Sequence, residues 1–85
     1  MSWTLRIAHR AEESLVKSPA KDRTRLVAAL GEMQDNPFAG DVVRLQGEEN
    51  TWRQRVGSYR IIFEIDIKGL TVDVLNVARR TSTTY

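Results

Sequence analysis

The sequence of 85 residues has no cysteine and a single histidine, His9. The missing thiols exclude a disulfide framework and every cysteine-ligated zinc site, and one imidazole is too few for a histidine-based structural zinc. No apolar run approaches the roughly 20 residues of a membrane helix, and the alternating N-terminus is unlike a signal peptide. No P-loop, G-x-G-x-x-G, G-x-S-x-G or H-E-x-x-H motif occurs. We therefore expect a cytoplasmic protein with no metal, no cofactor and no membrane partner.

Lysine is also scarce, because 10 of the 13 basic residues are arginine. Arginine suits planar, bidentate contacts with phosphate or carboxylate groups. Residues 1–42 balance six basic with six acidic side chains, whereas residues 43–85 carry seven basic and five acidic side chains. The net charge of +2 therefore lies in the second half of the chain. This placement, with a pI near 9.4, is compatible with a polyanionic partner.

The chain lacks repeats, low-complexity tracts and linkers, and 41% of its residues are hydrophobic. Residues 1–85 are therefore expected to form a single globular domain with one core. Residues 2–8 alternate between polar and apolar side chains, which predicts a strand. Helices are predicted over 10–17 and from Ser18-Pro19 to about Asp35, with Ser18 as the N-cap of the second helix. Asn36-Pro37 ends that helix, because a residue before proline disfavours the helical conformation.

The remainder of the chain has the pattern of strands. The short run Val42–Leu45 is expected to pair at an edge of the sheet. Residues 51–56, 59–66 and 70–78 are rich in β-branched and aromatic side chains. The order β-α-α-β-β-β predicts an α+β domain in which two helices pack on one face of a mainly antiparallel sheet.

Gly57-Ser58 separates two of these strands and predicts a two-residue hairpin turn of type II′. If Val56 faces Tyr59 across the turn, then Arg55 faces Arg60. Strand alternation then places one set of apolar side chains on the core face, namely Trp52, Val56, Tyr59, Ile61, Phe63 and Ile65. The same alternation places three arginines on the other face, namely Arg53, Arg55 and Arg60.

Two like charges directly opposite one another destabilise a sheet, by a few tenths to about 1 kcal/mol. Glu64 is the nearest carboxylate on that face, two positions of the same face beyond Arg60, so it neutralises the arginines poorly. One interpretation is that the guanidinium groups form an anion site suited to a phosphodiester. The other interpretation is a solvated face whose arginine stems cover apolar surface. Spacing alone leaves both interpretations open.

Other positions give weaker signals. Arg79-Arg80 ends the last strand, and alternation from a Lys68-Gly69 turn predicts Arg79 on the arginine face. Glu48-Glu49 is most simply a solvated turn, although a carboxylate there is able to reach the start of the hairpin. Trp3 and Trp52 are expected to belong to the core.

These motifs together resemble the RelE/ParE toxin superfamily, and in particular its RelE-like branch. The resemblance rests on Asn36-Pro37-Phe38, Arg44-Leu45-x-Gly47, the block Trp52-Arg53-x-Arg55-Val56-Gly57-x-Tyr59-Arg60-Ile61-Ile62-Phe63-Glu64-Ile65, the ending Val74-Leu75-Asn76-Val77-Ala78-Arg79-Arg80, and a tyrosine after it. It covers essentially the whole chain, and the hairpin block is its most specific part. It implies the RelE-like microbial RNase fold and a toxin of a type II toxin–antitoxin system.

The resemblance also implies an activity. RelE-like toxins are mRNA endonucleases that act on the ribosome, in the A site, without a metal. The 2′-hydroxyl attacks the adjacent phosphate and leaves a 2′,3′-cyclic phosphate and a 5′-hydroxyl. The catalytic positions of the family fall here on Arg53, Arg55, Arg60, Arg80 and Tyr85, so the resemblance favours Arg80 where alternation favours Arg79.

One departure from the family concerns the general base. Lysines often occupy the first two basic positions, where this chain has Arg53 and Arg55. Arginine cannot act as a base, because its pKa stays above about 12. The base is then Tyr85, a carboxylate of Glu48-Glu49, or a ribosomal group.

The resemblance further implies partners and two alternative functions. An antitoxin protein is expected to cover the basic face with an acidic, partly disordered segment, and the toxin–antitoxin complex is expected to bind operator DNA through the antitoxin. The active toxin would engage the ribosome and its mRNA. The first alternative is a ParE-like inhibitor of DNA gyrase with no RNA chemistry. The second is an inactive relative that serves as an antitoxin-binding module.

Overall fold

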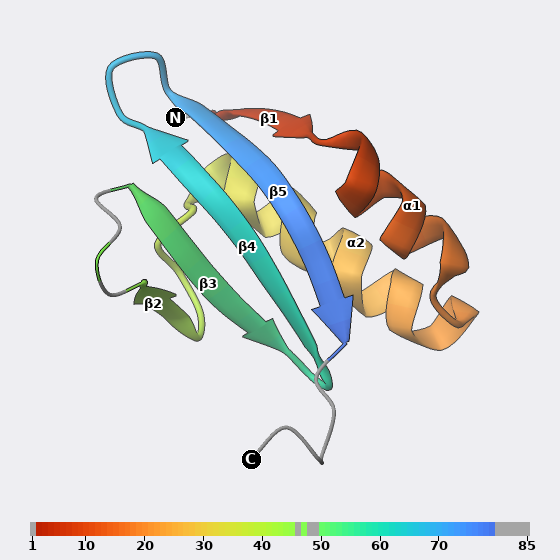
Figure 1. Cartoon of the computed structure of the whole chain (residues 1–85). Coiled ribbons are helices and arrows are strands. Elements are labelled where there is room, and N and C mark those ends of the chain that lie inside the picture. Colours follow the sequence, from red (N-terminus) through yellow and green to blue (C-terminus); the bar gives the residue numbers. More distant parts are fainter. Residues whose placement is uncertain (1, 46, 48–49, 80–85) are drawn as a thin grey trace.

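The computed structural model describes residues 2–45, 47 and 50–79. The elements in chain order are β1 (Thr4–Ile7), α1 (His9–Lys17), α2 (Ala20–Asp35), β2 (Val42–Arg44), β3 (Thr51–Val56), β4 (Tyr59–Asp66) and β5 (Thr71–Arg79). The five strands form one sheet in the order β1-β5-β4-β3-β2, in which β1 pairs with β5 in parallel and the other neighbours are antiparallel. Both helices pack on one face of this sheet (Figure 1), so the α+β architecture is confirmed. The opposite face, here called the open face, carries neither of them.

The core lies between the helices and the central strands β4 and β5. Ile61 and Phe63 of β4, and Val72 and Val74 of β5, have no exposed surface, and they alternate with more accessible residues along each strand. The helices add buried side chains at helical spacing, namely Ala11, Leu15, Leu26, Ala29, Leu30 and Met33. Burying a side chain such as Phe63 contributes about 1.5–3 kcal/mol relative to its exposure, so this layer holds the sheet against the helices.

Three aromatic rings close one end of the core. Phe38, in the loop after α2, packs edge-on against Trp3 with ring centroids 6.2 Å apart and against Trp52 with centroids 5.4 Å apart. Both tryptophans were expected in the core; they are partly buried and pack against the core cluster. Because Trp52 belongs to β3, these rings help to tie the hairpin to the end of α2.

The junction between the helices differs from the sequence expectation. Ser18 does not cap α2; its backbone N–H and its hydroxyl both donate to the carbonyl of Leu15, the latter at 2.6 Å. Ser18 therefore closes α1, and α2 follows Pro19 with no side-chain cap. A serine between two adjacent helices is able to donate to the last carbonyls of the first helix or to accept from the first amides of the second helix. Here Ser18 donates to the first helix.

A β-bulge interrupts the pairing of β4 with β5. Ile62 pairs with Asn76 while the next residue, Phe63, pairs with Val74, so Leu75 is an extra residue in β5. The bulge shifts the alternation of every residue after it. Arg79 pairs with the buried Tyr59 and therefore lies on the helix side of the sheet. The prediction that Arg79 lies on the arginine face is wrong, because simple alternation does not include the bulge.

Candidate functional site

The β3–β4 hairpin has the predicted register. Val56 pairs with Tyr59, Arg55 with Arg60 and Arg53 with Ile62. Gly57 has a φ of +57°, whereas the φ of Ser58 is not positive. A positive φ at the first central residue alone is the signature of a type II′ turn. A Cβ at Gly57 would lie 3.2 Å from a guanidinium nitrogen of Arg25, a residue of α2. Both the backbone conformation and this close contact favour glycine here.

Arg53, Arg55 and Arg60, here called the arginine cluster, share the open face of this hairpin. Arg55 is exposed, whereas Arg53 and Arg60 are half-buried. In the part of the chain that the structure describes, none of the three has a carboxylate within ion-pair distance. The structure therefore brings together three of the five predicted catalytic residues in a group that no described carboxylate pairs with.

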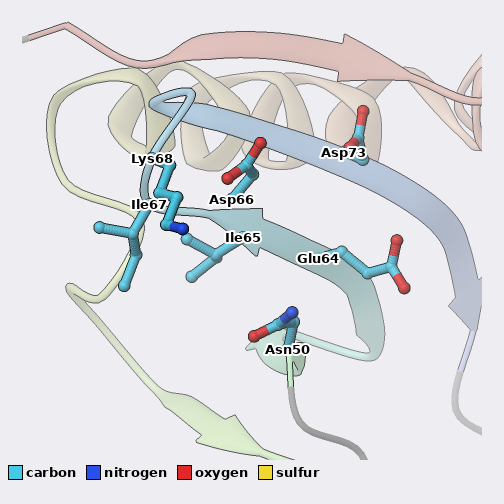
Figure 2. Close-up of a pocket in the computed structure, with 7 residues that line it drawn as sticks. All are labelled: Asn50, Glu64, Ile65, Asp66, Ile67, Lys68 and Asp73. Atoms are coloured by element: carbon cyan, nitrogen blue, oxygen red, sulfur yellow. The ribbon is translucent and has the colours of Figure 1, made fainter.

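The same face has an acidic end at the far ends of β4 and β5. Glu64, Asp66 and Asp73 line a pocket of about 400 Å³ together with Asn50, Ile65, Ile67 and Lys68 (Figure 2). The carboxylate of Asp73 accepts a hydrogen bond of 2.6 Å from Nε of Arg6. That hydrogen bond and the charge of Asp73 raise the pKa of Arg6 above its ordinary value. Asp66 accepts a hydrogen bond from the backbone N–H of Gly69 at 3.2 Å, so it also supports the β4–β5 turn.

The acidic end is far from the arginine pair at the hairpin tip. Arg60 and Glu64 are four residues apart on β4, which is about 13 Å at the usual rise of a strand. Salt screens charges beyond about 8–10 Å at physiological ionic strength. Glu64 is therefore too far away to neutralise Arg60. Arg53 is nearer to it, because its partner Ile62 is two residues from Glu64 and such diagonal neighbours lie about 7–8 Å apart. The excess of positive charge that an approaching anion meets is therefore greatest at Arg55 and Arg60.

The bulge adds a residue that sequence reasoning missed. Asn76 pairs with Ile62 and lies on the open face beside the arginine cluster, although alternation from Val72 and Val74 would have placed it in the core. Its amide provides a neutral donor and acceptor next to the guanidinium groups. Period-two alternation contains no signal for it, because the bulge is a property of the pairing between two strands.

The remaining candidates are not tested by the structure. Arg80 and Tyr85, as well as Glu48 and Glu49, lie outside the described residues. In residues 2–45, 47 and 50–79, no three histidine, aspartate or glutamate side chains are grouped so as to hold a metal ion. No described helix is long and apolar enough to cross a membrane.

Comparison with known proteins places this arrangement in a family. The family model described as the ParE toxin of the type II toxin–antitoxin system parDE matches residues 4–83. No relative was found among curated protein sequences.

Solved structures resemble the whole fold. A chain of the archaeal RelE–RelB complex from Pyrococcus horikoshii superposes with a TM-score of 0.86 at 22% identity, over 98% of this chain and 100% of that chain. The toxin–antitoxin complex RelBE2 from Mycobacterium tuberculosis contains a chain with a TM-score of 0.83 at 28% identity, over 94% of this chain and 100% of that chain. The isolated RelE toxin of E. coli has a TM-score of 0.84 at 19% identity, over 98% of this chain and 89% of that chain.

Proposed function

Since the chain belongs to the RelE/ParE superfamily of type II toxin–antitoxin toxins, we propose that it is a ribosome-dependent mRNA endonuclease. The single observation that carries the proposal is the arginine cluster, which faces solvent without a carboxylate partner among the described residues. A superfamily toxin that only bound a protein target would not need like charges directly opposite on a ladder, which cost stability. A phosphodiester at this position would offset that cost.

The proposed reaction is a transesterification in the A site. The 2′-oxygen of one nucleotide bonds to the adjacent phosphorus and its proton leaves to a base. The bond from phosphorus to the 5′-oxygen breaks, and that oxygen takes up a proton. The products are a 2′,3′-cyclic phosphate and a 5′-hydroxyl, and no metal is required by the balance of the step.

The arginine cluster supplies charge stabilisation in this scheme. Negative charge on the non-bridging oxygens grows as the pentavalent phosphorane forms. Fixed guanidinium donors therefore bind the transition state more strongly than the ground state. Arg55 and Arg60, directly opposite each other, would hold the phosphate from two strands, and Arg53 would hold the neighbouring backbone. Removing one such donor typically costs 10²–10³-fold in rate.

The general base is proposed to come from outside the arginine cluster. The arginine side chain stays protonated in proteins and therefore cannot accept the proton. Glu64 is the nearest described carboxylate on β4, and it is about 13 Å from Arg60 by strand rise. The proposal therefore assigns the base to Tyr85, to Glu48 or Glu49, or to a ribosomal group, with Arg80 as a further charge-stabilising residue.

A ParE-like inhibitor of DNA gyrase is the second candidate. Its support is the family model, which is the one described as the ParE toxin. The RelE-like candidate is supported by the arginine cluster and by the RelBE2 structure, which is 28% identical over 94% of this chain. ParE-like members usually lack the full set of arginines and tyrosine that this sequence contains, so we favour the RNase. An inactive antitoxin-binding relative is the third possibility, and a toxicity assay separates it from both.

An antitoxin is the proposed protein partner. The Pyrococcus horikoshii and Mycobacterium tuberculosis structures are toxin–antitoxin complexes. We propose that an acidic segment of the cognate antitoxin covers the open face at the arginine cluster, because opposite charge speeds and orients association. Operator DNA would be bound by the complex through the antitoxin, and the proposed location of the complex is the cytoplasm.

Primer extension on an mRNA in a purified translation system tests the function. Breaks inside codons that require ribosomes are the expected result. Intact mRNA, together with growth arrest on expression, would contradict it. A DNA gyrase supercoiling assay on the same protein then tests the ParE-like alternative, and absence of any growth arrest would indicate the inactive relative.

A further inference from the structure

A basic pocket lies on the helix side of the sheet, at the same end as the arginine cluster. It has a volume of about 440 Å³ and is lined by Ser14, Lys17, Ser18, Pro19, Tyr59, Val77 and Arg79. Its lining, as far as the structure describes the chain, contains no carboxylate. Neither Lys17 nor Arg79 forms an ion pair within the described part of the chain. Both charged groups of the pocket are therefore positive, and no described carboxylate pairs with either of them.

Tyr59 supplies a neutral donor to the pocket. Its side chain is buried, with 7% of its surface exposed, and its hydroxyl makes no hydrogen bond with any described residue. Among the described residues, the buried side-chain polar atom without a partner is Oε1 of Gln54 and not the Tyr59 hydroxyl. The phenol therefore has a buried ring and a hydroxyl that is open to the pocket, where it is able to donate. The hydroxyls of Ser14 and Ser18 are already engaged, because they donate to the carbonyls of Arg10 and Leu15.

The start of α2 adds to the positive potential of this pocket. Pro19 lines the pocket and directly precedes α2, whose first amide groups have no side-chain cap. Uncapped amides at a helix N-terminus favour a nearby anion. Asp22 is the acidic residue of the first turn, and it does not line the pocket.

The pocket and the arginine cluster are linked through two adjacent pairs of the sheet. Tyr59 pairs with Arg79, and the next residue, Arg60, pairs with Ala78. Tyr59 and Arg60 therefore direct their side chains to opposite faces at the same strand ends. The parallel partner β1 pairs only with Thr71–Val74, so it does not cover this end of β5.

We propose that this pocket is a second phosphate site. It holds a backbone phosphate of the RNA strand next to the phosphate at which that strand is cleaved. Lys17 and Arg79 provide the charge, and the Tyr59 hydroxyl provides a neutral donor. An RNA strand carries phosphates at regular intervals, so it engages both faces of one end of the sheet as it passes around the hairpin tip. This inference rests on the proposed RNA function.

Salt-dependent binding tests the site. The probe is a 12-nucleotide single-stranded RNA whose 2′-hydroxyls are methylated to prevent cleavage, measured by fluorescence anisotropy with the full-length protein. Each phosphate contact on single-stranded nucleic acid contributes about 0.7 to the slope of log K against log salt. Lys17→Gln is expected to lower the slope by about that amount. Lys68→Gln, the matched loss of one lysine at the acidic end, is expected to leave it unchanged.

Tyr59→Phe is a second variant that keeps the ring in the core. It is expected to weaken RNA binding severalfold without changing the salt slope, because the hydroxyl is neutral. Equal slopes for Lys17→Gln and Lys68→Gln, or unchanged affinity for Tyr59→Phe, would overturn the site. Weaker binding of a decaglutamate peptide by Lys17→Gln with unchanged RNA binding would also overturn it, in favour of an acidic protein.

Arg60→Gln in the same assay separates the two proposals. A lower slope for Arg60→Gln with no effect of Lys17→Gln would overturn the second phosphate site and leave the RNA function standing. A lower slope for Lys17→Gln with no effect of Arg60→Gln would support the site and count against the proposed role of the arginine cluster.

Discussion

The two ends of the open face contain charges of opposite sign and treat them differently. At the acidic end, Asp73 is paired with Arg6 and Asp66 accepts a hydrogen bond from the β4–β5 turn. At the hairpin end, Arg55 and Arg60 face each other, and no described carboxylate lies within ion-pair distance of either. Charges that serve the fold are matched by partners inside the fold. We propose that the unmatched charges at the hairpin end bind a partner that comes from outside.

The contrast also separates stability from function. An exposed ion pair such as Arg6–Asp73 is worth little, because water screens it. The like-charge pair Arg55–Arg60 opposes folding by a few tenths to about 1 kcal/mol. A site that costs stability where a neutral pair would not is typical of function. Variants of the arginine cluster are therefore expected to lose activity, whereas variants at the acidic end are expected to keep it.

The largest effect is expected from removing two charges of the arginine cluster. Arg53→Gln combined with Arg60→Gln should slow cleavage of ribosome-bound mRNA by at least about 10³-fold in single-turnover kinetics, because two donors to the phosphorane are lost. The matched double variant, Arg6→Gln with Lys68→Gln, removes the same charge from the acidic end and should cleave at the wild-type rate. Equal losses in both would show that net charge alone matters.

A smaller effect is expected from Arg55→Lys. The charge is kept, but the planar fork that binds two phosphate oxygens is lost. Cleavage should fall by roughly tenfold, the value of about one charged hydrogen bond. A rate above wild type, with a new dependence on pH, would instead show that a lysine here acts as the missing acid or base.

Stability should change in the opposite direction at the same position. Arg55→Thr removes the like-charge pair and should raise the free energy of unfolding by a few tenths to about 1 kcal/mol in urea denaturation. Arg53→Thr is the control, because Arg53 pairs with Ile62 rather than with a charge. A gain of the same size in both variants would point to strand propensity and not to repulsion.

The smallest effect is expected from Glu64→Gln. Glu64 lies about 13 Å from Arg60 along β4, too far to take a proton from a nucleotide held there. The cleavage rate should stay at the wild-type value in the same single-turnover assay. A loss of 10²-fold or more would identify Glu64 as the general base, which the account assigns elsewhere.

The sequence predicted what depends on local rules. A two-residue turn at Gly57-Ser58 fixes the register of its two strands, so the pairing of Arg55 with Arg60 followed directly from the sequence. Apolar alternation in β4 then identified Ile61 and Phe63 as core residues. These features are set by residues close together in the chain.

Features that depend on distant pairing were not predictable. The extra residue Leu75 is visible only when β5 is placed beside β4, and it moves Arg79 to the helix side and Asn76 to the open face. The contact between Arg25 and Gly57 needs the packing of α2 against the hairpin. Ser18 has the sequence of an N-cap, but it serves the preceding helix.

The most direct test is primer extension across a ribosome-bound mRNA with wild type, Arg60→Ala and Arg6→Ala side by side. The two variants lose the same side chain from the two ends of one face. The account predicts breaks within codons for wild type and Arg6→Ala, and a loss of 10²–10³-fold for Arg60→Ala. Undiminished cleavage by Arg60→Ala would contradict the central claim that the arginine cluster is the catalytic surface.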